Sequence, residues 1–375
     1  MSVFAGLGLD PVVNAAGKMT YLGASVLSDD VVAACADAGR SWVDVAALAE
    51  RAGAEVAAAT GAEAGFVTSC SAAGLALAAA GCVTGADPGL VRTAPVLPEG
   101  AVRRIVLQKG HAIDFGAPLT SMIRMGGAEA DEVGSANRCT RAELESALAR
   151  PAAAVFFVVS HHVTGDELCG LGDVVAAAHA RGVPVVVDAA AETDLRAHLR
   201  AGADLVVHSG HKAVGGPTSG LVSGRRDLVA ACAAHNQGIG RAMKIGKEAV
   251  AGLVVALRAY AGGAEAEGAR LAAVAGELAE ALRDVPGLRT ELVADATRPI
   301  TRVRVAVRPD AGVSASELVA RLAAGTPSVR VRAHHAASGW FELDPRPVRT
   351  GDAGRIGDAV RAALSPAGGG AGARG

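Results

Sequence analysis

The sequence predicts an α/β protein that combines a large domain, built on a mainly parallel sheet, with a small α+β domain. Three observations lead to this prediction. A chain of 375 residues can bury a large core. Short apolar runs alternate with Ala-rich stretches of helical length over the first 250 residues, and this pattern changes after them.

Buried strands are expected where short apolar runs end in polar or glycine-containing turns. The run Val183–Val187 is apolar on both faces, which is typical of a parallel strand covered by helices on each side. The expected strands are Phe66–Ser69, Ile105–Gln108, Val155–Ser160, Val183–Asp188, Leu205–Ser209 and Leu221–Ser223. Stretches with the length and composition of crossover helices lie between them at Ala72–Cys82, Thr140–Leu148 and Leu171–Arg181. This alternation predicts a doubly wound sheet.

The C-terminal third has a different pattern. A long helix rich in Ala, Leu, Glu and Arg is expected from Lys247 to Arg283, with a break at the turn residues Tyr260–Gly263. After it we expect strands at Thr301–Arg308, Val329–Arg332 and Gly339–Leu343, and helices at Ser314–Ala323 and Ala353–Leu364. These short elements predict the small α+β domain.

Four regions of the chain follow from these patterns. Residues 1–40 are expected to pack on the large domain or on a partner subunit, and residues 41–250 to form the large domain. Residues 251–365 would form the small domain. The tail at 366–375 is rich in Gly and Ala with nothing to bury, so we expect it to be disordered.

Composition excludes several classes of function. The net charge is −2, with 36 basic and 38 acidic residues mixed along the chain, so no broad basic field is present to hold nucleic acid. The six cysteines show neither CxxC pairs nor metal-ligand spacing, which predicts reduced thiols and no metal site. No apolar run is long enough to span a membrane and no export segment is recognisable, so we expect a cytoplasmic protein.

The strongest chemical signal is the pair Asp188 and Lys212. Both follow expected strands, and parallel sheets bind ligands beyond the carboxyl ends of their strands, so the two side chains are expected to face one crevice. A carboxylate and a lysine suit pyridoxal phosphate (PLP), since the carboxylate keeps the pyridine nitrogen protonated and the amine forms a Schiff base. Alone, Asp188 would be read as a helix cap and Lys212 as a surface lysine. The Ser-Gly-His-Lys turn and the following Gly215-Gly216-Pro217 favour the cofactor site.

These segments resemble the fold-type I PLP enzymes, in the branch of selenocysteine synthase and the D-glucosaminate-6-phosphate ammonia-lyase-like proteins. The ammonia-lyase-like group is the more similar, especially through SHH, VDAAAETDL and GRAMKIGKE. The resemblance implies the fold-type I fold, PLP bound to Lys212, a small-molecule substrate, and a homodimer or higher homo-oligomer. The matching stretches are Val12–Ser25, Thr60–Gly85, Gln108–Gly116, Val159–Gly165, Val187–Leu195, Ser209–Gly220 and Gly238–Leu257.

Further cofactor contacts are implied by this resemblance. The turn Ser69-Cys70-Ser71 precedes an Ala-rich helix, whose N-terminal N–H groups would cradle the cofactor phosphate, although Ser71 would also suit a plain helix cap. Ser209, three residues before Lys212, would add a phosphate contact. His111 would stack on the pyridine ring or else be a polar loop residue.

The loop segment Ser160-His161-His162 has an open role. In Ser160-His161-His162, one residue would contact the cofactor's phenolic oxygen or act on the substrate, and the sequence does not decide which. Metal binding by the two histidines is not expected without a third ligand.

Cationic residues supply the candidates for substrate binding. Arg241 and Lys244 would bind an anionic part of the substrate or a neighbouring subunit's cofactor phosphate, or else are solvated charges; Lys247 is followed by Glu248, which excludes a P-loop. Arg346 is the preferred partner for the substrate α-carboxylate, with Arg349 second.

The expected activity is chemistry at the α-carbon of an amino acid or amino sugar acid. Elimination that releases ammonia and a 2-keto acid is the preferred reaction, and it follows from the family resemblance. A racemase or epimerase and an aminotransferase remain alternatives, since they share the first proton removal. A selenocysteine synthase-like reaction on tRNA is disfavoured by the balanced charge, and a binding protein without catalysis is disfavoured by the retained Asp188 and Lys212.

Overall fold

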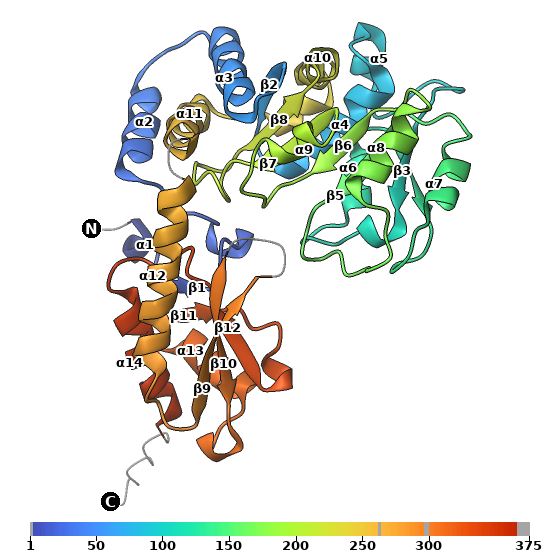
Figure 1. Cartoon of the computed structure of the whole chain (residues 1–375). Coiled ribbons are helices and arrows are strands. Elements are labelled where there is room, and N and C mark those ends of the chain that lie inside the picture. The colour runs from blue at the N-terminus through green and yellow to red at the C-terminus, as the bar shows by residue number, and fades with distance from the viewer. Residues whose placement is uncertain (1–2, 262–263, 296–299, 366–375) are drawn as a thin grey trace, which may run out of the picture. The chain divides into compact units, whose positions relative to one another are not determined.

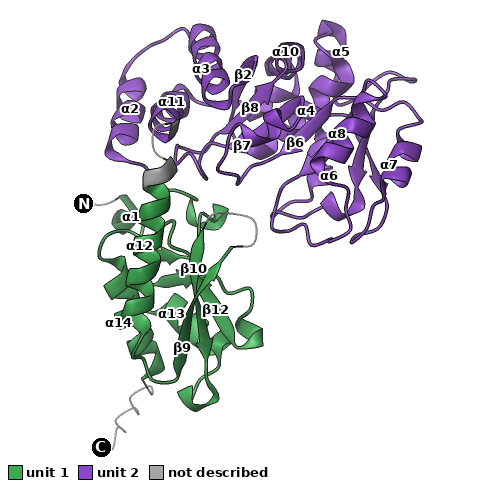
Figure 2. Ribbon diagram, viewed as in Figure 1, with its two compact units in different colours: residues 1–26, 263–375 green, residues 27–262 purple. Residues whose placement is uncertain are grey.

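The computed structural model describes residues 3–261, 264–295 and 300–365 (Figure 1). The chain forms two compact units (Figure 2). Unit 2 comprises residues 27–262, and unit 1 comprises residues 1–26 together with residues 263–375. The predicted disordered tail, 366–375, lies outside the described residues. No helix in the described ranges is both long and apolar enough to cross a membrane.

Unit 2 is built on a mostly parallel sheet. The order of the seven described strands is β2-β8-β7-β6-β5-β3-β4. Strand β8 runs antiparallel to both of its neighbours, and the remaining pairs are parallel. The strands are β2 (Ala64–Thr68), β3 (Arg104–Gln108), β4 (Glu129–Val133), β5 (Ala154–Val158), β6 (Val185–Asp188), β7 (Leu205–Ser209) and β8 (Gly220–Gly224). The mainly parallel sheet predicted from the sequence is therefore confirmed.

Helices cover both faces of this sheet because alternate strand residues point to opposite sides. On β6, Val186 packs in one core with Leu75 and Leu77 of α4, whereas Val185 and Val187 pack in a second core with α8. The helices of unit 2 are α2 (Asp29–Arg40), α3 (Val45–Thr60), α4 (Ser71–Thr84), α5 (Pro88–Thr93), α6 (Leu119–Met125), α7 (Arg141–Ala147), α8 (Leu171–His179), α9 (Ala197–Arg200), α10 (Arg226–Ala234) and α11 (Lys247–Ala261). Short 3-10 turns are η2 (Lys109–His111), η3 (His235–Gln237) and η4 (Ile239–Met243).

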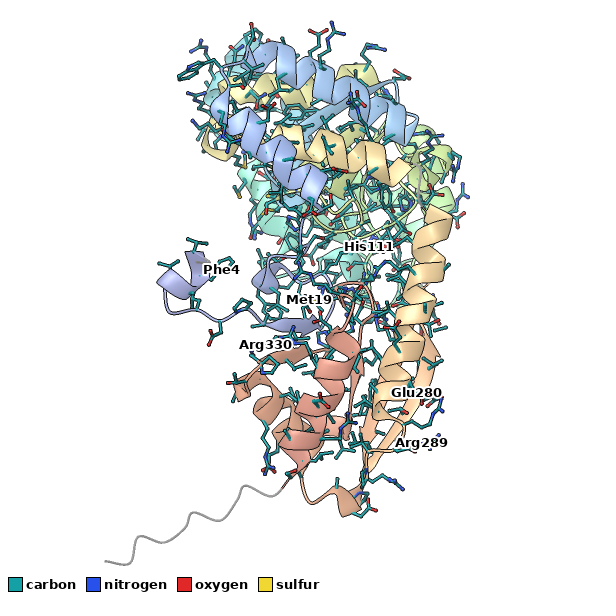
Figure 3. The ribbon with its side chains drawn as sticks, turned by 90° about the vertical axis from the view of Figure 1, so that its left-hand side faces the viewer. Phe4, Met19, His111, Glu280, Arg289 and Arg330 are labelled. Carbon is teal, nitrogen blue, oxygen red and sulfur yellow. The ribbon has the colours of Figure 1, made fainter. Side chains whose placement is uncertain are left out.

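Unit 1 is a small α+β body with an antiparallel sheet in the order β12-β10-β9. Its strands are β9 (Leu288–Ala294), β10 (Thr301–Val307) and β12 (Trp340–Leu343), and a separate parallel pair joins β1 (Val13–Ala15) to β11 (Val329–Val331). Its helices are α1 (Val3–Gly6), α12 (Ala264–Leu282), α13 (Ala315–Ala324) and α14 (Asp352–Leu364), with the 3-10 turns η1 (Thr20–Leu22), η5 (Pro309–Ala311) and η6 (Ala336–Ser338). Helix α1 buries none of its residues, and Figure 3 shows it, with Phe4, apart from the sheets of its unit.

The core of unit 1 lies between the antiparallel sheet and its helices. Val303 and Val305 of β10 pack with Leu278 of α12 and Ile356 of α14. Val13 of β1 belongs to the same core and pairs with Val329, so the start of the chain folds with its C-terminal part.

The element boundaries differ from the predicted ones by one or two residues at most strands. The long helix expected from Lys247 corresponds to α11, which ends at Ala261, and α12, which begins at Ala264. Residues 262 and 263 of the expected break lie outside the described residues. Strands β4 and β9 were not predicted because their sequences, EADEV and LRTELVA, are too polar to stand out as buried runs.

Candidate functional site

Asp188 and the turn that carries Lys212 follow the neighbouring strands β6 and β7 at one edge of the sheet of unit 2. Asp188 ends β6 on the face that α4 covers, and its side chain is nearly buried, with a residue exposure of 7%. Its Oδ1 accepts a hydrogen bond from the Ala190 N–H at 3.1 Å. Burial raises the pKa of Asp188 to about 6, and the nearby Lys212 amine opposes that rise. The carboxylate therefore favours a cationic neighbour.

Glycines shape the turn that carries Lys212. The Gly210 N–H donates to the Ser219 carbonyl at 2.9 Å, and the Gly216 N–H donates to the Gly210 carbonyl at 2.8 Å, so the turn folds back on itself. A Cβ at Gly210 would lie 2.1 Å from Ser219 Oγ, and Gly215 has a φ of +74°. Only glycine fits such positions without strain, which explains the glycines around Lys212.

The N-terminus of α4 lies at the same edge of the sheet. Cys70 caps this helix, its Sγ accepting a hydrogen bond from the Ala73 N–H at 3.3 Å, and Ser69 and Ser71 flank it, partly exposed. Gly220 of β8 lets the chain pass closely, because a Cβ there would be 2.5 Å from the Cys70 backbone. The positive end of the helix dipole and its first N–H groups make this turn suited to an anion.

Ser209 contributes a buried hydroxyl group beside this turn. Thr68 pairs with Gly220 across β2 and β8, and Gly220 pairs with Ser209 across β8 and β7, so the three residues lie in one row. Ser209 is 2% exposed, and its Oγ has no hydrogen-bond partner among the described residues. A buried hydroxyl without a partner indicates a place for a ligand atom.

His111 is held in one tautomer. Its Nδ1 accepts a hydrogen bond from the Val158 N–H at 3.2 Å, so the proton of the neutral ring must be on Nε2. The ring meets Phe157 edge to face at 4.6 Å between centroids. Burial lowers the pKa of His111 to about 4, which keeps the ring neutral at physiological pH. Val158 pairs with Asp188, and this places His111 next to the strand that carries the carboxylate.

Ser160, His161 and His162 follow β5 in a loop. Ser160 Oγ accepts a hydrogen bond from the His162 N–H at 3.3 Å, and the two imidazole centroids are 4.1 Å apart. Both histidines are exposed. The geometry does not single out one of the three for cofactor or substrate.

The predicted substrate-binding residues fall in both units. Arg241 in η4 and Lys244 are exposed in unit 2. Lys247 at the start of α11 donates a hydrogen bond to the Ala38 carbonyl of α2, and it forms an ion pair with Glu248 at 2.8 Å. Arg346 belongs to unit 1, where its Nε and Nη2 donate to the two oxygens of Asp344 at 2.8 and 2.7 Å. Arg349 is also in unit 1 and is exposed.

Sequence reasoning did not single out Thr68 and Gly220, which shape the anion turn, and of the cationic side chains around Asp344 it named Arg346 but not Arg302. Thr68 and Gly220 gain their importance from the pairing of β2, β8 and β7, which no local pattern shows. In the second case a signal existed, because the Arg-Val-Arg alternation at Arg302–Arg304 places two cations on one face of a strand.

Comparisons with known proteins agree with this geometry. A model of the SelA family, L-seryl-tRNA selenium transferase, matches residues 12–284. The chain is 42% identical over 353 residues to D-glucosaminate-6-phosphate ammonia lyase of Salmonella typhimurium (strain 14028s / SGSC 2262), covering 94% of this chain and 95% of the relative. It is 43% identical over 346 residues to 5'-C-glycyluridine monooxygenase-decarboxylase of a Streptomyces species, with 91% and 86% covered.

A solved structure of D-glucosaminate-6-phosphate ammonia-lyase matches with a TM-score of 0.89 at 41% identity, covering 97% of this chain and 98% of that one. Solved fold-type I PLP enzymes are structural neighbours, so the predicted fold class is confirmed. The resemblance stated from the sequence is confirmed as well. This chain therefore belongs to the L-seryl-tRNA selenium transferase (SelA) family, which its fold, its matched residues and its similarity to an ammonia-lyase together show.

Proposed function

We propose that this protein is a PLP-dependent ammonia-lyase that acts on an amino sugar acid or a related β-hydroxy amino acid. One observation carries the proposal: a buried carboxylate, Asp188, lies within electrostatic reach of Lys212 at the carboxyl edge of the sheet. The similarity to an ammonia-lyase over 94% of the chain supports the reaction type.

The residues present fit the chemical groups of PLP. Asp188 would pair with the protonated ring nitrogen, since burial disfavours its charge and raises its pKa, and a cation beside it would stabilise the ionised form. Lys212 supplies the amine for the aldehyde. The unpartnered Ser209 hydroxyl and the first turn of α4, with Ser69, Cys70 and Ser71, would hold the phosphate. His111 offers a neutral ring with a proton on Nε2 beside them.

The bound cofactor would supply an electron sink for the substrate's α-carbon. Lys212, once displaced by the substrate amine, would remove the α-proton as a general base. Asp188 would hold the ring charge throughout. Loss of the α-proton and the β-hydroxyl removes one water and leaves an enamine. After its release the enamine tautomerises to an imine, and hydrolysis of the imine consumes one water and gives ammonia and a 2-keto acid. Arg241, Lys244 and Arg346 remain the proposed substrate contacts, with His161 the proposed catalytic residue of the loop after β5.

The deciding experiment follows three products at once. Purified holoenzyme would be incubated in deuterated water with D-glucosaminate 6-phosphate, while ammonia, keto acid and deuterium at the α-carbon are measured. Equal amounts of ammonia and keto acid are expected, and Lys212→Ala should abolish both. Deuterium uptake with inverted configuration and no ammonia would instead identify an epimerase, and transfer of the amine to a keto acid an aminotransferase.

A second candidate function follows from the Streptomyces relative. That relative is named as a monooxygenase-decarboxylase. Its sequence identity to this chain is 43%, and that of the ammonia-lyase is 42%, so identity does not separate the two. The same incubation in an oxygen electrode separates the two reactions. Oxygen uptake matched by carbon dioxide release would replace the ammonia-lyase proposal, whereas ammonia release without oxygen uptake supports it.

We also infer that the protein is a homo-oligomer of the cytoplasm. Apolar side chains are exposed near the start of the chain and between α2 and α3, with Phe4 54% and Trp42 100% exposed, which is typical of surfaces that a second copy covers. The six cysteines are free thiols, as is usual in a reducing compartment. Sedimentation equilibrium should give a multiple of 37.1 kDa, and a monomer would contradict the inference.

A further inference from the structure

Gln108 is a polar side chain at a core position of the large sheet. It ends β3, and it lies on the same face of the sheet as Val106, because alternate residues of a strand point to one face. Val106 belongs to the core that α7 and α8 cover, together with Leu144 and Val174. Gln108 is 1% exposed. A buried amide is costly unless its oxygen and its nitrogen both find hydrogen-bond partners.

Both ends of this amide bind one residue, Cys169. Gln108 Oε1 accepts a hydrogen bond from the Cys169 N–H at 2.8 Å, and Gln108 Nε2 donates one to the Cys169 carbonyl at 3.0 Å. The two bonds resemble the reciprocal pairing between neighbouring strands of an antiparallel sheet. Cys169 is 8% exposed and lies two residues before α8. An apolar side chain would fill this position without a desolvation cost, so the two hydrogen bonds explain why an amide stands here.

The loop after β5, residues 159–170, is held at both ends. At its start the Val159 N–H donates a hydrogen bond to the Asp188 carbonyl at 2.9 Å. The Ser-His-His segment at 160–162 comes next, so the loop leaves the sheet beside the residue that carries the carboxylate of the candidate site. At its other end the loop is held by the two hydrogen bonds of the glutamine amide.

A second loop, residues 134–139 after β4, supports the same end of the loop after β5. The Cys139 N–H donates to the Glu167 carbonyl at 3.0 Å, and the Glu167 N–H donates to the Asn137 carbonyl at 3.2 Å, which makes a short parallel bridge. The Cys169 thiol donates to the Cys139 carbonyl at 3.1 Å. The end of the loop after β5 is therefore fixed by backbone pairing on one side and by the glutamine amide on the other.

Gln108 also leads directly into the turn η2, which ends at His111, a residue labelled in Figure 3. Between the two, Gly110 lets the chain pack closely, because a Cβ there would lie 2.5 Å from the Ala136 carbonyl oxygen and 2.8 Å from Leu168 Cδ1. The turn that carries His111 is thus in contact with the loop after β4 and with the loop after β5. These three segments have little room to shift independently of one another.

We propose that Gln108 is a positioning residue of the candidate site. By holding Cys169 it fixes where the loop after β5 places its Ser-His-His segment relative to His111 and Asp188. Its amide is buried and engaged at both ends, so it acts through the loop and not on the substrate. The proposal rests on the proposed function, because this loop carries His161 as the proposed catalytic residue.

Two substitutions separate the hydrogen bonds from the size of the side chain. Gln108→Leu keeps a similar volume and removes both bonds. Gln108→Glu keeps both bonds only while its carboxyl is protonated, because the protonated group donates to the Cys169 carbonyl and accepts from the Cys169 N–H, whereas the ionised group only accepts. Burial raises the pKa of a carboxyl, up to about 8–9 in fully buried sites, so the variant is compared at about pH 6 and pH 8.

The groups around position 108 keep their charge between these pH values. Burial raises the pKa of the Cys169 thiol above its usual value of 9.0 and that of the Cys139 thiol to about 11, and it lowers the pKa of His111 to about 4. The charged side chains of the surrounding segments are exposed, namely Lys109, Arg138, Asp166, Glu167 and Asp173. His161 and His162 are present in wild type as well, so each variant is compared with wild type at the same pH.

Hydrogen exchange of the holoenzyme, measured by mass spectrometry, reports on the loop without using activity. Gln108→Leu should raise the exchange rate in residues 160–170 about tenfold or more, because the Cys169 N–H loses its acceptor and the loop loses its anchor. Gln108→Glu should exchange like wild type at pH 6 and faster than wild type at pH 8. Thr84→Val is the matched control, since it removes a buried hydrogen bond with His235, 2.8 Å long, at the far end of α4. This control should leave exchange in the loop as in wild type.

Turnover separates a positioning role from a merely structural one. In Gln108→Leu, kcat for ammonia release from D-glucosaminate 6-phosphate should fall about tenfold or more. The visible absorbance of bound cofactor should stay as in wild type, because Asp188 and Lys212 follow other strands. In Gln108→Glu the loss should be present at pH 8 and absent at pH 6. Thr84→Val should lower the thermal midpoint and leave kcat unchanged at both pH values.

Unchanged exchange in Gln108→Leu would overturn the proposal, and so would faster exchange with wild-type turnover. If Gln108→Leu does not fold, the comparison of Gln108→Glu at the two pH values decides, since it uses one protein. A wild type that releases no ammonia would refute the proposed function instead. Deuterium at the α-carbon then replaces ammonia as the measured product, and the same comparison of variants decides the role of Gln108.

Discussion

At the scale of single residues, the chemistry depends on groups whose charge is set by burial. Asp188 is held in a site that disfavours its charge, and His111 is held neutral by burial and by the Val158 N–H. A cofactor ring with a positive nitrogen would relieve the first of these situations, which is the physical basis of the proposed cofactor site.

Replacement of Asp188 by Asn tests this role. The amide keeps the shape but cannot balance a ring charge, so we expect kcat for ammonia release to fall on the order of 100-fold or more. The visible absorbance of bound cofactor should persist, which separates a loss of catalysis from a loss of binding. Activity within a few fold of wild type would contradict the assignment.

The cofactor-free protein should respond to pH through the same residue. The pKa of Asp188 rises from 3.8 to about 6 on folding, so the folded state binds more protons than the unfolded state between these values, and stability falls as pH rises through that window. Asp188→Asn should therefore stabilise cofactor-free protein at pH 7 by about 2–3 kcal/mol, and by much less at pH 4. Urea unfolding at both pH values measures the difference.

His111 should act in the opposite direction. Its pKa falls from 6.5 to about 4 on folding, so its contribution to stability is complete above pH 6.5 and is lost as pH falls towards 4. His111→Phe removes this dependence but leaves the buried Val158 N–H unpaired, at a cost of about 1–3 kcal/mol at pH 7. The gap between wild type and variant in urea unfolding should narrow between pH 7 and pH 5. A gap that is constant over this range would show that folding does not lower the pKa of His111.

At the scale of elements, the turn after β7 decides where Lys212 lies. Gly210→Ala would place a Cβ 2.1 Å from Ser219 Oγ and 2.8 Å from Leu253, so the turn must shift. We expect cofactor affinity to fall about tenfold or more, measured by titrating PLP into cofactor-free protein. Gly172→Ala in α8 is the control, since a Cβ there meets nothing within 4 Å, and its affinity should equal that of wild type.

Elements also show where sequence patterns succeed. The runs at β6 and β7 were predicted because both faces of those strands are buried, which leaves an uninterrupted apolar sequence. The edge strand β4 was missed because one of its sides has no partner strand and its residues remain partly exposed. A strand can therefore be predicted from a local sequence pattern when it is buried, and is easily missed when it is partly exposed.

At the scale of the whole molecule, the start of the chain folds with its end. Val13 is 2% exposed and lies in the core of unit 1, whereas the adjacent Val12 is 38% exposed. Val13→Ala should lower the unfolding free energy of unit 1 by about 1–3 kcal/mol, because it removes buried methyl groups, while Val12→Ala should change it by less than about 0.5 kcal/mol. Hydrogen exchange measured by mass spectrometry would locate the effect; faster exchange in β10 and β12 is expected, and exchange increased only in unit 2 would contradict it.

The sequence by itself determined the fold class, the two central strands, and the Asp188 and Lys212 positions at their ends. It did so because buried parallel strands leave local apolar runs, and the ends of parallel strands meet at one edge. The tertiary structure decided three other matters: the Thr68, Gly220 and Ser209 row, the His111 tautomer, and the cations gathered around Asp344. Each depends on side chains brought together across strands far apart in sequence, and such pairings leave no trace in a local pattern.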